Sequence, residues 1–158
     1  MPAVANAPLI AHRTITVQTQ RPVEFVDITP FLAEVVRETG LVAGLAMVQT
    51  RHTTTGLLVN ENEPLLLTDL EAFFARVATA PGGYAHDDFS RRTVNLTPYE
   101  RTNGHAHCCA ALLRTSECIS VVGGALDLGR WQRIFLVEFD GAQRRELSIT
   151  LIGEQRDG

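Results

Sequence analysis

The run WQRIFLVEFDG at residues 131–141, with ELSITLI at residues 146–152, decides the fold. Residues 131–139 are rich in aromatic and branched apolar side chains, which predicts a strand. Residues 146–152 alternate strictly between polar and apolar side chains, which predicts a second strand with one buried face. Asp140-Gly141, between the two runs, is typical of a tight hairpin turn. The C-terminal part of the chain is therefore predicted to be all β-structure.

Earlier segments add further strands. Residues 14–19 and 23–26 alternate in the same way and are predicted to pair with each other. Residues 41–49 are almost wholly apolar, which favours a buried central strand, although periodicity alone leaves a helix open. Two more strands are predicted at residues 56–61 and 118–122.

Residues 30–39 are predicted to form a helix between two end signals. Thr29 would be its N-cap and Pro30 its first residue, because a hydroxyl can accept a free backbone N–H and proline suits the first turn. Gly40 would end the helix in the left-handed conformation that glycine adopts easily.

Two more helices follow from the spacing of apolar residues. Residues 64–80 place apolar side chains about 3.6 residues apart, which predicts an amphipathic helix. Residues 105–114 are predicted to open a short helix, with Asn103 near its cap. The chain is therefore predicted to be a single α+β domain over residues 1–158, mainly antiparallel sheet, with residues 1–12 as a loose lead-in.

The composition excludes several classes of protein and mechanism. All 14 basic residues among the 158 are Arg, which rules out a Schiff-base lysine and a P-loop lysine. The net charge of −4 argues against a nucleic-acid partner. No segment approaches the ~18 consecutive apolar residues of a membrane span. Three cysteines without disulfide spacing indicate a reducing cytoplasm, so we expect a soluble cytoplasmic protein.

Two polar segments hold most of the chemically versatile side chains. One runs from Tyr84 to Leu113 and the other from Arg51 to Gly56. Imidazole is the commonest side-chain metal ligand, so we expect the fold to bring these segments together. A metal or phosphate site and a set of surface histidines on a long loop both remain open. His105 and His107 would share a face on a strand and diverge on a helix, so we expect only one of them in any one site.

For several other polar residues, a functional role and a purely structural or solvent-exposed role are both open. The run from Thr53 to Gly56 binds an anion or is simply a bent strand. Glu61 follows an apolar strand and points into a site or to solvent. Trp131 is interpreted as a packing residue, and Arg144-Arg145 as a solvated edge unless it contacts an anion or another subunit.

Taken together, these segments resemble the YjbQ family over about residues 13–153. The resemblance rests on five motifs that occur in the family's order and spacing. They are His52-Thr53-Thr54-Thr55-Gly56 with Asn60-Glu61, Tyr84-Ala85-His86, Asn103-Gly104-His105-Ala106-His107, Gly124-Ala125-Leu126-Asp127-Leu128-Gly129-Arg130-Trp131-Gln132, and Glu138-Phe139-Asp140-Gly141.

The resemblance implies a fold, an assembly and an activity. The implied fold is α+β with a jelly-roll-like sandwich, and the implied assembly is a homotrimer. Members are often described as secondary thiamine-phosphate synthases, which join a hydroxymethylpyrimidine diphosphate to a thiazole phosphate and release pyrophosphate. His52, His86 and His107 fall on recurrent histidines of a cleft that often holds a metal, so we expect them to ligate a divalent ion, zinc by preference.

The same resemblance suggests roles for further residues. Glu61, His52 and His107 are the expected catalytic residues. A small phosphorylated molecule is expected to contact substrate-binding residues drawn from several segments, namely Thr53, Thr54, Asn60, Asn103, Trp131, Gln132 and Arg144 (or Arg145). Cys109 and Gln143 stand where the family carries basic residues. A trimer that binds a metal or a phosphorylated ligand without turnover is the alternative, and a purely structural assembly protein is a third.

Overall fold

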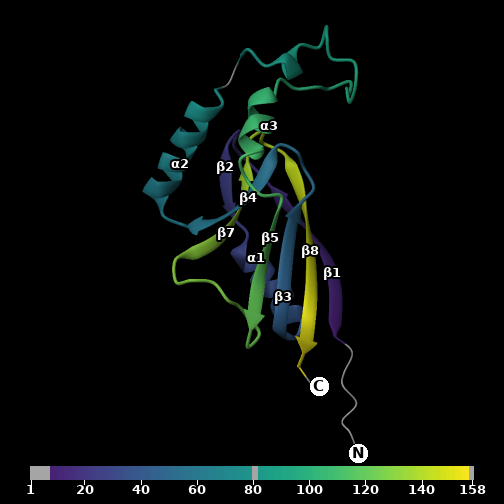
Figure 1. Cartoon of the computed structure of the whole chain (residues 1–158), viewed down its shortest axis with the longest axis vertical. Helices are drawn as coiled ribbons and strands as arrows, with labels where there is room; N and C mark the ends of the chain where they lie inside the picture. The colour runs from purple at the N-terminus through teal and green to yellow at the C-terminus, as the bar shows by residue number, and fades with distance from the viewer. Residues whose placement is uncertain (1–7, 80–81, 157–158) are drawn as a thin grey trace, which may run out of the picture.

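Two antiparallel sheets form the frame of the protein, as seen in a computed structural model that describes residues 8–79 and 82–156 (Figure 1). The larger sheet, sheet A, has the strand order β1-β8-β3-β5-β6, and the smaller, sheet B, has the order β2-β7-β4. The strands are β1 (Leu9–Gln18), β2 (Glu24–Asp27), β3 (Leu41–Thr50), β4 (Thr55–Glu61), β5 (Ser116–Val122), β6 (Ala125–Leu126), β7 (Gln132–Glu138) and β8 (Arg144–Gln155).

Sheet B is covered on both faces, and β7 shows why. Ile134 and Leu136 of β7 belong to a core cluster shared with sheet A and helix α1 (Thr29–Thr39). Phe135 and Val137 belong to a second cluster shared with α2 (Pro64–Val77) and α3 (Gly104–Ala110). All four side chains are fully buried, and each contributes about 1.5–3 kcal/mol to stability. An unbroken apolar run is what a strand buried on both faces requires.

The predicted α+β class is confirmed, but the predicted hairpin is wrong. β7 pairs with β2 and β4 in sheet B, whereas β8 pairs with β1 and β3 in sheet A. The turn at Asp140-Gly141 therefore carries the chain from one sheet to the other. The physical reason is burial, because β7 has two apolar faces and β8 has one, so the two strands need different surroundings.

Three local predictions near the N-terminal end need correction. The strand at residues 24–27 pairs with β7 and not with β1. β1 begins at Leu9, so the described part of the predicted lead-in, from Leu9 to His12, lies in the strand. Thr29 is the first residue of α1 and does not cap it, since its hydroxyl accepts the backbone N–H of Ile134 at 2.8 Å.

The helices and the long connection agree with the sequence in their main features. Gly40 ends α1 at a φ of 68°, as predicted, and residues 41–50 form a strand. α2 ends at Val77, and the last residue of the predicted helix, residue 80, lies outside the described residues. α3 ends at Ala110, before the predicted Arg114. Between α2 and α3 only one short helical turn, η1 (Ala85–Asp87), interrupts the described irregular segment.

None of the helices in the described residues has the length and apolar character needed to cross a membrane.

Candidate functional site

Three connections meet at one end of the two sheets and enclose a cleft of about 540 Å³. The first links β3 to β4, the second links β7 to β8, and the third is the long segment before α3. The predicted meeting of the two polar segments is thereby confirmed. The lining residues are Arg51, His52, Thr53, Thr54, His86, Arg92, Asn95, Thr97, Tyr99, Glu100, Arg101, Asn103, His107, Asp140, Gln143 and Arg145.

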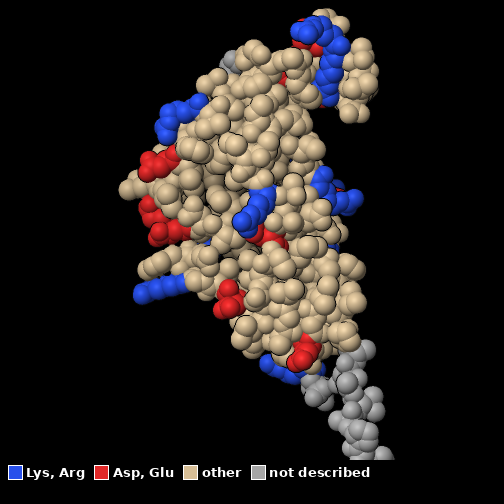
Figure 2. All heavy atoms as spheres, in the orientation of Figure 1, with Lys and Arg blue, Asp and Glu red and all other residues tan. Residues whose placement is uncertain are grey.

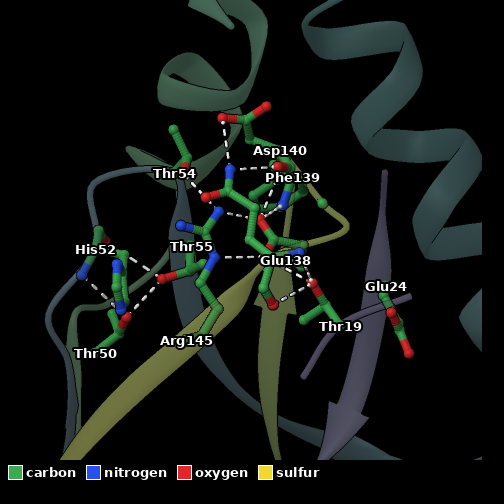
Figure 3. Close-up of polar contacts among 12 residues, drawn as sticks. Thr19, Glu24, Thr50, His52, Thr54, Thr55, Glu138, Phe139, Asp140 and Arg145 are labelled. Atoms are coloured by element: carbon green, nitrogen blue, oxygen red, sulfur yellow. Dashed lines mark hydrogen bonds and ion pairs between the residues drawn. The ribbon is translucent and has the colours of Figure 1, made fainter. Parts of the chain in front are cut away.

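The floor of the cleft is a buried ion pair between Arg145 and Glu138 (Figure 3). Arg145 donates from Nε and Nη2 to the two carboxylate oxygens at 2.5 and 2.6 Å, and Nη2 also donates to Thr54 at 2.9 Å. Glu138 further accepts the backbone N–H groups of Phe139 and Asp140 at 3.0 and 2.8 Å. This network ties β7 of sheet B to β8 of sheet A, so the cleft has a rigid base.

His52 is held by the backbone of β8. Its Nε2 accepts the N–H of Glu146 at 2.9 Å. An amide N–H can only donate, so Nε2 must be unprotonated and the ring proton of the neutral imidazole must sit on Nδ1. Burial, helped by the charge of Arg145, lowers the pKa of His52 and favours this neutral form.

His86 and His107, which also line the cleft, form a close pair. Their ring centroids are 4.6 Å apart, and the rings meet edge to face. Burial lowers the pKa of His107, and the neighbouring His86 and Arg92 lower it further. His107 is therefore neutral at pH 7, with a lone pair available to a ligand.

Asn103 is oriented by its neighbours at the start of α3. Its amide nitrogen donates to Asp140 at 2.9 Å, and Asp140 is itself ion-paired with Arg101 at 3.1 Å. The carboxylate of Asp87 accepts the N–H groups of Asn103 and Gly104 at 3.0 and 2.9 Å. These contacts leave the side-chain oxygen of Asn103 pointing to no protein donor.

Three buried polar atoms of the described residues have no hydrogen-bond partner, and all three belong to residues that line the cleft. They are Nε2 of His86, Nη1 of Arg92 and Oδ1 of Asn103. Arg92 approaches Glu100 no closer than 3.5 Å. A buried polar group without a partner costs about 1–3 kcal/mol, so this concentration of unpaired groups is typical of a site that a ligand completes.

Several predicted site residues lie in the cleft and several do not. His52, Thr53, Thr54, His86, Asn103 and His107 all line it. His105 turns away from it on α3, as predicted for a helix. Arg145 lines it, whereas Arg144 lies on the outer face of sheet A, beside Thr16 and Glu146.

Asn60, Glu61, Trp131 and Gln132 are far from the cleft. Glu61 pairs with Gln132 at one end of the β4–β7 ladder, and Thr55 pairs with Glu138 at the other end, beside the cleft. The ladder separates the two ends by roughly 20 Å at about 3.3 Å per residue. Glu61 therefore does not reach the cleft of its own chain. Trp131 is exposed beneath the guanidinium of Arg130, 4.6 Å from the ring centre.

The cleft residues in the long segment and in the turn between the sheets were not predicted from the sequence. Arg92, Glu100 and Arg101 belong to the first group, and Asp140 and Gln143 belong to the second. The length of the irregular segment was the available signal, because such segments in compact domains are usually functional. Asp140 was hidden because Asp-Gly reads equally well as a simple hairpin turn.

The histidines fit a metal ion in part. His86 and His107 are close enough to supply two imidazole ligands, and Nε2 of His86 is buried without a partner. His52 does not fit in this arrangement, because Nε2 accepts a backbone N–H and Nδ1 carries the proton. Across residues 8–79 and 82–156, no three His, Cys, Asp or Glu side chains stand together as a ready metal site.

Comparison with known proteins places the chain among small conserved proteins. Residues 13–154 match the profile of the family described as UPF0047 protein YjbQ-like. A UPF0047 protein of Methanothermobacter thermautotrophicus is 31% identical over 140 residues, which cover 89% of this chain and 90% of the relative. A UPF0047 protein of Archaeoglobus fulgidus is 36% identical over 135 residues, covering 85% and 96%.

A solved structure supports the same grouping. A YbjQ-like protein of unknown function from Sulfolobus solfataricus P2 superposes with a TM-score of 0.83 at 28% identity. The superposition covers 94% of this chain and 100% of the other. The two-sheet architecture described above is therefore shared with an experimentally solved relative.

Proposed function

Because the chain belongs to the UPF0047 YjbQ-like family, we propose that its cleft binds a small phosphorylated molecule together with a divalent metal ion. The single observation that carries the proposal is the set of unpaired buried atoms on His86, Arg92 and Asn103. Nη1 of Arg92 lies within ion-pair distance of Glu100 but has no hydrogen-bond acceptor, which an anionic oxygen of a ligand would supply, and a metal ion is a partner that a neutral imidazole accepts.

The charge of the cleft supports a phosphorylated ligand. Its lining includes Arg51, Arg92, Arg101 and Arg145, whose carboxylate partners are Glu146, Glu100, Asp140 and Glu138. The pairs of Arg51 and Arg92 are long, at 3.6 and 3.5 Å, so an anionic ligand can compete for these two guanidiniums. Arginine matches the geometry of phosphate oxygens through its planar fork of N–H donors. The hydroxyls of Thr53 and Thr54 lie beside these guanidiniums and add donors of the kind that phosphate groups accept.

His86 and His107 would hold the metal ion through two neutral imidazoles, and ligand oxygens would complete its coordination. Zinc suits imidazole ligands and an open coordination position, and it is the ion we propose. A bound divalent ion would supply Lewis-acid stabilisation of negative charge on a departing phosphate group.

The reaction we propose is the transfer implied by the resemblance to secondary thiamine-phosphate synthases. The nitrogen of a thiazole phosphate forms a bond to the methylene carbon of a hydroxymethylpyrimidine diphosphate. The carbon–oxygen bond to the diphosphate breaks, and pyrophosphate leaves with the electron pair. The arginines of the cleft would stabilise the charge on that leaving group. His52 would act as a positioning residue, because it fixes the 51–54 connection against β8.

The decisive test is a calorimetric titration with pyrophosphate, with and without zinc. We expect binding to the native protein and at least about tenfold weaker binding to Arg92→Gln, since a hydrogen bond to a charged group contributes about 1.5–3 kcal/mol. Arg133→Gln is the matched control, because Arg133 is exposed on sheet B beside Asp27, away from the cleft. Absence of any binding, or equal loss in both variants, would refute the proposal.

Binding without turnover is the second candidate, and one observation favours it. Glu61 does not reach the cleft of its own chain. The carboxylates that do line it are both engaged, Asp140 with Arg101 and Glu100 with Arg92. A steady-state assay with the two thiamine precursors separates the candidates. Formation of thiamine phosphate that is lost in His107→Ala supports the transferase, and tight binding with no product supports the binding protein.

We also propose that the chain assembles as a homotrimer through the outer face of sheet A. Ile10, Ile152 and Leu45 are exposed and stand side by side across β1, β8 and β3. Figure 2 shows a broad surface with few charges over these strands. Apolar side chains aligned across a flat sheet are a surface that burial in an interface would stabilise.

A further inference from the structure

A second hollow, of about 500 Å³, lies beneath α2 and differs in character from the cleft. Its walls are mainly apolar. Phe74 of α2, Phe139 after β7 and Cys109 of α3 are all buried members of the second core cluster. Val23, at the start of sheet B, adds a further apolar side chain. This α2 pocket has the size of an ordinary small-molecule site.

The sequence of α2 explains why the pocket is empty of protein side chains. The helix turns Thr68, Ala72 and Ala75 toward the hollow, and these residues are one helical turn apart on the same face. Its large side chains at Phe73 and Val77 are exposed instead. The side chains of Thr68, Ala72 and Ala75 are too short to fill the hollow, so apolar surface remains uncovered there.

An intermediate hollow of about 450 Å³ lies next to both the α2 pocket and the cleft and shares lining residues with each. This hollow shares Arg101 and Asp140 with the cleft. It shares His105 and Phe139 with the α2 pocket. The boundary with the cleft is the Arg101–Asp140 ion pair, and the side chain of Arg101 is 48% exposed. Arg101 is the more exposed partner of this pair, so its side chain can rotate toward solvent and let one molecule extend past it, while Asp140 keeps the amide of Asn103 as a donor.

We propose that the cleft and the α2 pocket form one bipartite site for an amphiphilic phosphate ester. The phosphate occupies the arginine-lined cleft, and an apolar alkyl or aromatic group passes Arg101 and fills the α2 pocket. This inference rests on the proposed phosphate binding and adds the class of ligand. The lining residues that the neighbouring hollows share point to one small molecule, because a polar and an apolar half lie on either side of an exposed side chain that can move.

The test measures the affinity of the protein, loaded with zinc, for inorganic phosphate and for methyl, butyl, hexyl, octyl and decyl phosphate below their critical micelle concentrations. Beyond the chain length that reaches Arg101, each methylene that enters the apolar pocket should strengthen binding about fourfold. Ala75→Leu fills the pocket and should abolish this gain. The ratio of the affinity for decyl phosphate to the affinity for inorganic phosphate should therefore fall.

Val77→Leu is the matched control, because Val77 lies on the same helix but is exposed outside the pocket. It should keep the native dependence on chain length. If inorganic phosphate binds but the affinity does not change with alkyl chain length, the bipartite site is wrong. The proposed phosphate binding in the cleft would still stand. No binding of inorganic phosphate would overturn the proposed function itself. A change in sedimentation mass in Ala75→Leu, with native chain-length dependence, would assign the pocket to a protein partner and overturn the inference.

Discussion

At the scale of single residues, Glu138 joins the two sheets at the base of the cleft. Its carboxylate has no exposed surface and accepts from Arg145, from two backbone N–H groups and from Thr19 at 3.2 Å. Each of these contacts donates a hydrogen bond, so the acceptor oxygens of Glu138 hold the two strands and the Asp140 turn together.

Removing the charge of Glu138 should destabilise the whole protein. Glu138→Gln leaves Arg145 buried without a counter-charge, and we expect the free energy of unfolding to fall by about 3–5 kcal/mol. Urea denaturation measures the loss. Glu34→Gln is the control, because its ion pair with Arg37 is solvent-exposed and should contribute little. Equal stability of the two variants would contradict the structural role of Glu138.

Histidine substitutions should separate metal ligation from positioning. We expect His107→Ala to remove stoichiometric zinc from protein purified without a tag, because one of two imidazole ligands is lost. His52→Ala should retain zinc, since His52 Nε2 is engaged by the N–H of Glu146. Elemental analysis of zinc per chain gives the answer. Retention in both variants, or loss in His52→Ala alone, would contradict the ligand pair His86 and His107.

The histidine environment also predicts a dependence of stability on pH. The pKa of His107 is lowered in the folded protein, whereas the unfolded chain titrates near pH 6.5. Between these two pKa values the unfolded state binds more protons than the folded state. The contribution of neutral His107 to the free energy of unfolding is therefore fully present above about pH 6.5 and is lost as the pH falls below it. His107→Gln should flatten this loss in urea titrations at several pH values, whereas His12→Gln should not. If the free energy of unfolding depends on pH in the same way in the native protein and in His107→Gln, this prediction is wrong.

At the scale of elements, β3 and β8 approach each other more closely than side chains allow. Gly44 pairs with Gly153, and a Cβ at Gly44 would lie 2.1 Å from the carbonyl oxygen of Ile152. The same is true in reverse, since a Cβ at Gly153 would lie 2.1 Å from the carbonyl oxygen of Ala43. Glycine at both positions therefore allows β3 and β8 to pair at this short distance.

We therefore expect Gly44→Ala to lower the free energy of unfolding by about 1–3 kcal/mol or more, the usual cost of overpacking. Gly129→Ala is the matched control, because a Cβ there would meet only the movable end of Gln132 at 3.2 Å. Thermal denaturation compares the two. A Gly44→Ala variant as stable as Gly129→Ala would show that the strands separate easily at this point.

At the scale of the whole molecule, the proposed homotrimer makes the outer face of sheet A an interface. Leu45→Arg places a charge in the row formed with Ile10 and Ile152, where burial would be costly. We expect the variant to sediment at the monomer mass of 17.3 kDa, and the native protein at three times that mass. Leu65→Arg, on the exposed side of α2, should remain assembled. A native protein that sediments as a monomer would contradict the trimer.

The sequence by itself determined the elements and the fold class. The apolar run at residues 134–137, the spacing along α2 and the glycine at residue 40 act on their immediate neighbours, so they can be interpreted without knowing the rest of the fold. The motifs around His52 and His107 also identified the family and two of the three segments that form the cleft.

Only the tertiary structure decided how those elements combine. The sequence Asp140-Gly141 is typical of a hairpin turn. Because β7 is buried on both faces, however, β8 pairs in the other sheet. The same arrangement places Glu61 about a strand length from the cleft and commits His52 Nε2 to the N–H of Glu146. The reason is physical, because strand pairing and side-chain contacts depend on which distant surfaces are buried together, and local periodicity does not encode this.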